Sequence, residues 1–167
     1  MQPGPMSEFV LPLRWLLGSW KSISAKGMYP TYKDFTFCDK LTFKTIGQPM
    51  LNYEAVSWNP ETLLPIHLES GFLRINPKTP NVAFLVAHNF GVVTLEEGTV
   101  CKQTVRFETS GVLTMSFKPG PKVCKLVRQY CLDANYNLRY ILYMETDRTP
   151  LTTHLEVVYE KDPCDCN

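Results

Sequence analysis

LRYILYMETDRTPLTTHLEVVY, residues 138–159, contains two runs of alternating side chains joined by a turn. In the first run, four apolar side chains share one face, as the two-residue period of a β-strand requires: Leu138, Tyr140, Leu142 and Met144. In the second run, a stretch rich in β-branched residues follows Pro150, which marks the turn. The stretch therefore predicts two successive strands, with His154 near the start of the second.

The same pattern extends over most of the chain. Turn signals recur about every dozen residues, at Asn59-Pro60, Asn76-Pro77, Glu97-Gly98, Ser110-Gly111, Pro119-Gly120-Pro121 and Asp133–Asn137. Between them, Val82, Phe84 and Val86 share one face, and Val123, Lys125 and Val127 alternate with Cys124, Leu126 and Arg128. This rhythm is typical of an antiparallel sandwich or barrel. Because about ten short strands must protect their edges, we expect an all-β fold closed into a single antiparallel barrel.

The ends of the chain differ from this pattern. Helical periodicity is confined to Leu13–Leu17, which predicts one or two turns that plug an open end of the barrel. Residues 1–8 contain proline and glycine and are predicted to be a disordered tail, and residues 163–167 a second tail. A chain of 167 residues suits one core, so residues 9–162 are expected to form one domain.

Charge and hydropathy exclude two classes of partner. The chain has 17 basic and 16 acidic residues, a net charge of +1 and no basic run, so a nucleic-acid partner is not expected. The apolar stretch Phe9–Trp20 is interrupted by Pro12 and Arg14 and lacks the length of a membrane span and the basic leader of a signal peptide. We therefore expect a soluble protein without a membrane partner, in the cytoplasm or alternatively the nucleus.

Six cysteines are present, at positions 38, 101, 124, 131, 164 and 166. This number would suit three disulfides in a secreted domain, but without a leader we expect free thiols. The spacing of Cys124 and Cys131 does not match a zinc pair, and the absence of Cys-x-x-Cys-His excludes covalent attachment of a c-type haem.

His154 is the best candidate in the sequence for carrying chemistry. A neutral imidazole at the edge of a strand is a common ligand for transition metals and haem iron. Strict alternation, however, places His154 on the face of Glu156 and Glu160, opposite Leu155 and Val157. An inward His154 therefore requires a bulge or a position before the strand. Pattern alone favours a solvated histidine.

A series of short motifs carries a family resemblance. The motifs are Gly18-Ser19-Trp20, Tyr29-Pro30-Thr31, Gly47 to Tyr53, Pro65 to Arg74, Ala87 to Val93 with Glu96-Glu97-Gly98, and Pro150 to Leu155. In this order and spacing they resemble the nitrobindin family, and most closely the nitrobindin-like domain at the C-terminal end of an animal THAP-type zinc-finger protein. The resemblance extends from about Trp15 to Lys161.

The resemblance implies a ten-stranded barrel, similar in outline to fatty-acid-binding proteins and lipocalins, that holds haem b near one opening. It further implies ferric iron that binds nitric oxide and isomerises peroxynitrite to nitrate, with no catalytic residue beyond the haem iron. The family's axial ligand maps onto His154, and the threonine beside its haem maps onto Thr31. We also place His88 and Met144 in the pocket, and expect a monomer or a homodimer.

Two features of the chain depart from the family. Its first strand is typically G-x-W-x-G-x-G-x-G-x-Y-P, whereas Lys21–Lys26 contains no glycine and one extra residue precedes Tyr29. The position of His88 is often glutamine in relatives, so a core histidine remains an alternative for it. For His67, beside Glu69, a structural hydrogen bond or salt bridge is the expected role.

Two other functions stay open at this stage. One is a haem-free carrier of a fatty acid or another small hydrophobic ligand, which would need an interior cation such as Arg74, Arg106 or Arg128. The other is a non-catalytic interaction domain in the same barrel.

Overall fold

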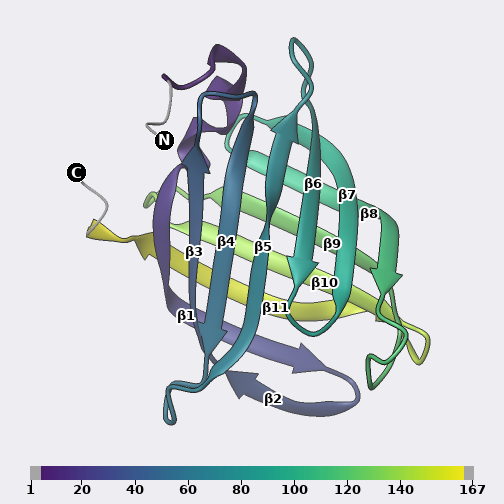
Figure 1. The fold of residues 1–167 in the computed structure, drawn as a ribbon. Helices are drawn as coiled ribbons and strands as arrows, with labels where there is room; N and C mark the ends of the chain where they lie inside the picture. Colours follow the sequence, from purple (N-terminus) through teal and green to yellow (C-terminus); the bar gives the residue numbers. More distant parts are fainter. Residues whose placement is uncertain (1–4, 164–167) are drawn as a thin grey trace.

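The computed structural model describes residues 5–163, which form one antiparallel sheet preceded by a short 3₁₀ helix, η1 (Glu8–Leu16) (Figure 1). The strands of this part of the chain are β1 (Gly18–Tyr29), β2 (Tyr32–Thr36), β3 (Cys38–Thr45), β4 (Met50–Trp58), β5 (Pro65–Ile75), β6 (Asn81–His88), β7 (Val92–Cys101), β8 (Thr104–Thr114), β9 (Val123–Leu132), β10 (Leu138–Thr146) and β11 (Thr149–Lys161). The predicted all-β class is confirmed.

The sheet closes into a barrel through β1 and β11. Their antiparallel pairing runs from Trp20 opposite Lys161 to Gly27 opposite Leu155. In the sheet, β11 to β3 follow one another in reverse sequence order, β1 pairs with β3, and the pairing of β1 with β11 closes the ring. Of the eleven strands in the described residues, β2 pairs with β1 alone and lies outside the ring. The other ten strands form the ring, as predicted. Phe37 separates β2 from β3, so these two strands are consecutive pieces of one bent segment. The hairpin of β1 and β2 extends beyond the ring at one end (Figure 1).

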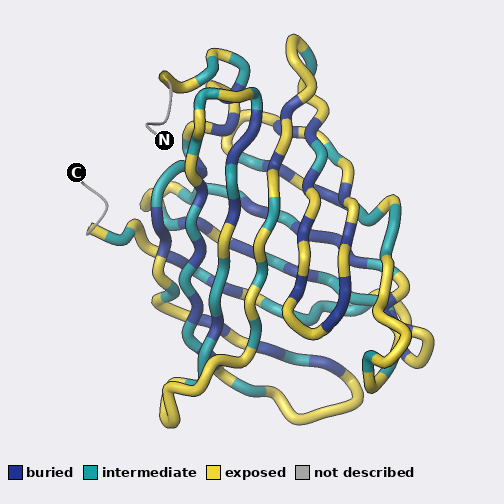
Figure 2. The backbone as a smooth tube through the Cα atoms, in the orientation of Figure 1, coloured by how far each residue is buried: buried dark blue, intermediate teal, exposed yellow. Residues whose placement is uncertain are grey.

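The alternation in the sequence matches the inner face of the barrel. On β6, Val82, Phe84 and Val86 are all buried, and on β10 the same holds for Leu138 and Leu142. Figure 2 shows buried and exposed residues alternating along the strands. Because successive side chains of a strand point to opposite faces, every second residue contributes to the core.

One predicted alternation is interrupted by a bulge. In the pairing of β9 with β10, Val123 lies opposite Thr146 and Lys125 opposite Glu145, so Cys124 is an extra residue. A bulge shifts the face on which later side chains lie. Val123 and Leu126 are therefore both buried, although strict alternation assigns them to opposite faces.

The helix η1 lies at the end of the barrel opposite the β1–β2 hairpin (Figure 1). Val10, Leu13 and Leu16 are fully buried in the common core, and the indole N–H of Trp20 donates to the carbonyl of Leu16 at 2.8 Å. The predicted helical turn is thus the last part of a longer helix, which plugs this end. No helix among the described residues has the length and apolar character needed to cross a membrane.

The middle of the barrel is filled by aromatic rings, among them Phe43, Tyr53, Phe84, Phe107 and Tyr130. With η1 above this layer, the free space inside the barrel lies at the other end. The predicted N-terminal tail lies partly outside the described residues, and Glu8 already begins η1. Most of the predicted C-terminal tail, including Cys164 and Cys166, also lies outside them.

Candidate functional site

His154 is the extra residue of a β-bulge. In the pairing of β10 with β11, Leu142 lies opposite Leu155 and Tyr143 opposite Thr153, so His154 has no partner on β10. A bulge re-aims the side chain of its extra residue. As a result His154 and Leu155, although adjacent in sequence, both line the same cavities, and the outward position that strict alternation gives His154 does not apply.

The imidazole of His154 is anchored through one nitrogen. Its Nδ1 lies 3.3 Å from the main-chain carbonyl oxygen of Met28 on β1 and 3.0 Å from the hydroxyl of Tyr32 on β2. A carbonyl oxygen only accepts hydrogen bonds, so this contact favours a proton on Nδ1, which a hydroxyl oxygen can accept as well. Nε2 is then unprotonated, and it makes no hydrogen bond to a described residue.

Burial determines the charge state of this histidine. Removal from water lowers the pKa of His154, and the hydrogen bond to the Met28 carbonyl opposes that effect only in part. The ring is therefore neutral at neutral pH. A neutral imidazole with Nδ1–H held by a carbonyl and Nε2 free is the arrangement that metal-ligating histidines commonly adopt.

Two adjoining cavities occupy this end of the barrel. The wider one, about 260 Å³, is lined by His154 together with Tyr32, Phe35, Phe37, Ser57, Ile66, His67, Phe90 and Leu155. The narrower one, about 80 Å³, reaches deeper along Met144, Leu142, Val123 and Leu126 to Glu69 and His88. Tyr32, Ile66 and Phe90 are each more than two-fifths exposed at the mouth. Exposed apolar side chains around a hollow mark a binding site for an apolar ligand.

The first strand retains small residues at the positions that are glycine in the resembled family. Opposite β11, Ser22 faces Tyr159 and Ser24 faces Val158, so Ile23 is the extra residue of a second bulge. With Ile23 taken out of the alignment, the three glycine positions of the family's first strand correspond to Ser22, Ala25 and Gly27. The extra residue noted in the sequence is therefore absorbed by the bulge, and the loss of glycines is milder than it first appears.

These residues fit a haem. The donor set is one neutral imidazole with a free nitrogen, the surroundings are apolar and aromatic, and the cavity mouth is open. This is the chemistry of a site that holds a porphyrin by one axial histidine. Met144 and His88 line the narrower cavity with His154. Thr31 lies in the exposed turn between β1 and β2 and lines neither cavity, so its role beside haem stays a prediction.

A buried ion cluster lies behind the narrower cavity. Nε of Arg128 on β9 lies 3.0 Å from Glu96 on β7, and its Nη1 lies 2.9 Å from Glu69 on β5. Arg128 and Glu96 are fully buried. Arg74 and Arg106 are exposed. Because the interior cation already has two carboxylates, it is a poor anchor for the carboxylate of a fatty acid.

Sequence reasoning missed this cluster. A signal was present, since Glu96 stands in phase with Val92, Thr94 and Val100, all of which are buried on β7. A charged residue at an inward position of an alternating strand is informative, because buried charges must be paired. The aromatic residues of the cavity mouth, Tyr32, Phe35 and Phe90, were also missed.

Two histidines extend the cluster toward the cavity. His88 is buried at the end of β6, and its Nδ1 lies 3.1 Å from Nε2 of His67 on β5 and 3.3 Å from Oε1 of Glu69. Burial lowers the pKa of His67 to about 4. Burial opposes ionisation of Glu69, but Arg128 and the imidazoles outweigh it and hold the pKa of this carboxyl well below its usual range. Glu69 is thus a carboxylate and His67 neutral at neutral pH.

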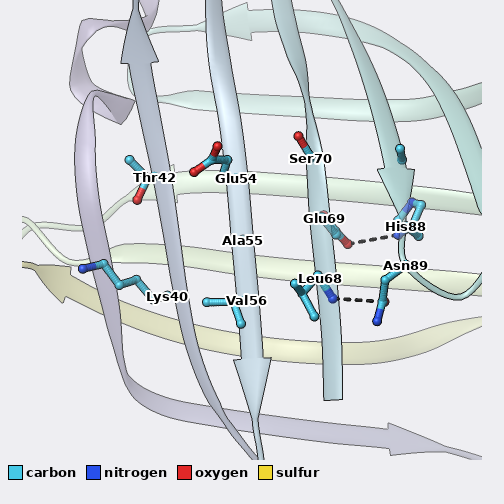
Figure 3. A pocket seen from close by; sticks show the side chains of 11 residues that line it. Lys40, Thr42, Glu54, Ala55, Val56, Leu68, Glu69, Ser70, His88 and Asn89 are labelled. Carbon is cyan, nitrogen blue, oxygen red and sulfur yellow. Dashed lines mark hydrogen bonds and ion pairs between the residues drawn. The ribbon is translucent and has the colours of Figure 1, made fainter. Parts of the chain in front are cut away.

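One further groove shares Glu69 and His88 with the narrower cavity, whereas no described cysteine lines either cavity of the site. A groove of about 570 Å³ runs across β3 to β6 and is lined mainly by side chains outside the core, including Lys40, Glu54 and Leu68 (Figure 3). It includes neither His154 nor the aromatic mouth residues. The four cysteines within the described residues, at positions 38, 101, 124 and 131, are free thiols.

Comparisons with known proteins agree with this geometry. A family model described as "THAP4-like, heme-binding beta-barrel domain" matches residues 9–161. A human protein named peroxynitrite isomerase THAP4 is 38% identical over 161 residues, which cover 96% of this chain and 28% of that protein. The chain therefore spans about a quarter of the length of its mammalian relatives.

Two further relatives correspond to nearly the whole chain. A protein of Arabidopsis thaliana named peroxynitrite isomerase Rv2717c is 31% identical over 159 residues, covering 94% of this chain and 91% of the relative. The crystal structure of Rv2717c from M. tuberculosis superposes with a TM-score of 0.83 at 28% identity, covering 94% of this chain and 99% of that one. With its closed barrel and its anchored histidine, this chain belongs to the family of THAP4-like, haem-binding β-barrel domains, the nitrobindin family.

Proposed function

We propose that this domain holds haem b through His154 and isomerises peroxynitrite to nitrate at the ferric iron. The observation that carries the proposal is the bulge at His154, which brings a neutral imidazole with a free Nε2 into an apolar cavity. The names of the relatives from human and Arabidopsis, both peroxynitrite isomerases, support the same reaction.

The residues of the chain have separate tasks in this proposal. His154 supplies the axial nitrogen, and the Met28 carbonyl orients its ring. Phe35 and Phe90, which line the wider cavity, would contact the porphyrin and limit the access of water. When bound, the haem would supply a ferric iron for the conversion of peroxynitrite to nitrate, an isomerisation without gain or loss of atoms or electrons.

Nitric oxide is a second proposed ligand at the same iron. It is a diatomic that would bind directly to the iron and would need no further group of the protein. We propose that the domain works as a monomer or as a homodimer, since the proposed site is built from one chain.

The haem-free carrier is the second candidate function. The apolar cavity favours it, but Arg128 is neutralised by Glu96 and Glu69, so no free interior cation is offered to a carboxylate in the cavity among the described residues. A haem-free carrier would not need His154 for ligand binding, so a variant without this histidine distinguishes the two functions.

The deciding experiment is a titration of the haem-free protein with ferric haem, followed at the Soret band. We expect saturable one-to-one binding by the wild type and loss of that spectrum in His154→Ala. The control is Leu113→Ala, which trims an exposed residue of β8 that lines neither cavity and keeps the ligand. Equal, weak and non-saturating spectra for wild type and His154→Ala would rule out ligation by His154.

Activity is measured by stopped flow. Mixing the haem-loaded protein with peroxynitrite should accelerate its decay and raise the yield of nitrate, whereas free haem at the same concentration sets the baseline. Saturable haem binding without acceleration above that baseline would show that the domain binds haem but does not isomerise peroxynitrite.

A further inference from the structure

Three potential metal ligands lie close together on the wall of the narrower cavity: His67, Glu69 and His88. Nε2 of His67 and Nδ1 of His88 are 3.1 Å apart, and Nδ1 of His88 is 3.3 Å from Oε1 of Glu69. One ligand atom from each residue lies within 4.8 Å of the others. Tetrahedral zinc with bonds of about 2.0–2.1 Å separates its ligands by about 3.3 Å. The two shorter spacings therefore match the edges of a metal coordination shell.

The strands explain why these three residues meet. His67 and Glu69 are two residues apart on β5 and so share a face, while Glu69 lies directly opposite His88 on β6. Cross-strand neighbours on one face are held at close range by the backbone ladder. Figure 3 shows the Glu69 and His88 side chains directed toward each other from the two strands. The arrangement is thus set by rigid elements, as a metal site requires.

The carboxylate is fixed in the orientation that ligation needs. Oε2 of Glu69 accepts hydrogen bonds from Tyr53 at 2.8 Å and from Arg128 at 2.9 Å, which leaves Oε1 facing His88. Carboxylates that ligate metals are themselves held by hydrogen bonds in this way. One oxygen is therefore anchored to the barrel and the other directed at the two imidazoles.

The metal-free arrangement leaves one group unsatisfied. The His88 side chain is 4% exposed, and its Nε2 is buried without a hydrogen-bond partner. With a proton on Nδ1, the lone pair of Nε2 has no donor. With the proton on Nε2, that buried N–H has no acceptor and the Nδ1 lone pair faces the Glu69 carboxylate. An ion held between Nδ1 and Oε1 would remove this second conflict, while Nε2 would stay as it is.

Charge points the same way. Around one guanidinium, that of Arg128, stand two carboxylates, those of Glu69 and Glu96. One guanidinium is thus shared by two acidic side chains, and buried charge is costly unless it is paired. A divalent cation bound beside Glu69 would add positive charge to this cluster.

We propose that His67, Glu69 and His88 form a second metal site that binds a divalent first-row transition ion such as Zn²⁺ or Fe²⁺. Two imidazoles and one carboxylate favour these ions over Mg²⁺ and Ca²⁺, which prefer oxygen ligands, and over Cu(I), which prefers sulfur. Three protein ligands leave at least one position open for an exogenous ligand. The same cavity is lined by His154, so this ion and a haem held by His154 would face a common space.

The test uses the haem-free chain of 167 residues, so that its result does not depend on haem binding. Co²⁺ serves as the spectroscopic probe, because its visible d–d bands report ligand number and geometry. The background protein carries Cys164→Ser and Cys166→Ser, which removes a thiol pair that would bind the ion adventitiously. We expect one equivalent of Co²⁺ to bind with intense visible bands, and Zn²⁺ to displace it.

Two ligand variants and one control decide the outcome. His88→Gln and His67→Gln should each weaken Co²⁺ binding at least tenfold, while His154→Ala should leave it unchanged. Circular dichroism and thermal unfolding confirm that the variants fold. Binding that is equally strong in both ligand variants, or no binding in the folded background protein, would overturn the proposal, and neither result affects the Soret titration.

Discussion

The ring of Phe35 on β2 occupies the space where a side chain on Gly27 of β1 would stand. A Cβ built on Gly27 collides with three carbons of that ring. Phe35 lines the wider cavity and packs against the core. The one glycine that remains at the end of the first strand therefore sets how far the ring stands from the centre of the cavity.

The first prediction follows from this contact. Gly27→Ala should push the Phe35 ring toward the cavity, at a cost of about 1–3 kcal/mol for overpacking. We expect a roughly tenfold or greater loss of haem affinity in the Soret titration. Gly111→Ala is the matched control, since its added Cβ meets only Leu95, at 3.9 Å. Equal haem affinity in both variants would show that Phe35 moves outward instead.

The second prediction tests the bulge. Exchanging two residues, Thr153→His with His154→Thr, keeps the composition but moves the imidazole to the position paired with Tyr143. Tyr143 alternates with Met144, which lines the cavity, so the moved ring should point away from it. The expected result is loss of the Soret band of ligated haem with little change in the melting temperature. Retained ligation would mean that another nitrogen holds the iron.

The third prediction concerns the buried ion cluster. Arg128→Met leaves Glu69 and Glu96 buried without their cation, and breaking a buried ion pair in this way costs about 3–5 kcal/mol. Chemical denaturation should show this loss in the free energy of unfolding. The control is Arg139→Met, whose ion pair with Asp133 is more than half exposed on the arginine side and is therefore weakened by solvent. Similar losses in the two variants would contradict the assigned role of Arg128.

The fourth prediction is a pH dependence with a defined sign. Burial, reinforced by the charge of Glu69, raises the pKa of Asp39 to about 7, while a 2.5 Å hydrogen bond from Tyr159 opposes this rise. Folding therefore favours the protonated carboxyl. Its stabilising contribution is complete below pH 4 and is lost as the pH rises to about 7, at up to about 1.4 kcal/mol per unit.

Asp39→Asn removes this titration and keeps an oxygen that can accept the hydrogen bond from Tyr159. The variant should gain stability relative to the wild type as the pH rises from 4 to 7, measured as the difference between their unfolding free energies. Comparing the two proteins cancels the titrations that they share, such as that of Glu69. A difference that stays constant with pH would show that Asp39 is ionised throughout this range.

The regular part of the fold could be predicted from the sequence because burial follows a fixed period there. Val82, Phe84 and Val86 on β6 have one buried face and no irregularity in their pairing. The alternation on β10, from Leu138 to Leu142, is equally regular. For such strands the chemistry of the side chains is enough to define which face is inside.

The site could not be predicted by the same reasoning. Ile23, Cys124 and His154 are each the extra residue of a bulge, and a bulge depends on the pairing of two strands that one strand's pattern does not encode. Alternation placed His154 outside, and only the family resemblance indicated a ligand. The meeting of Glu69 with Arg128 is likewise a tertiary contact between residues far apart in the chain.

The strand β2 is hydrogen-bonded to β1 alone, outside the ten-strand ring. The segment that carries Tyr32 and Phe35, the β2 flap, therefore contributes no pairing to the closed barrel. We expect its separation from β1 to affect the uptake and release of a bulky cofactor, while the pairing of the ten-strand ring maintains the fold. Mutations in the flap should accordingly change the exchange kinetics of the cofactor while the global unfolding transition stays in place.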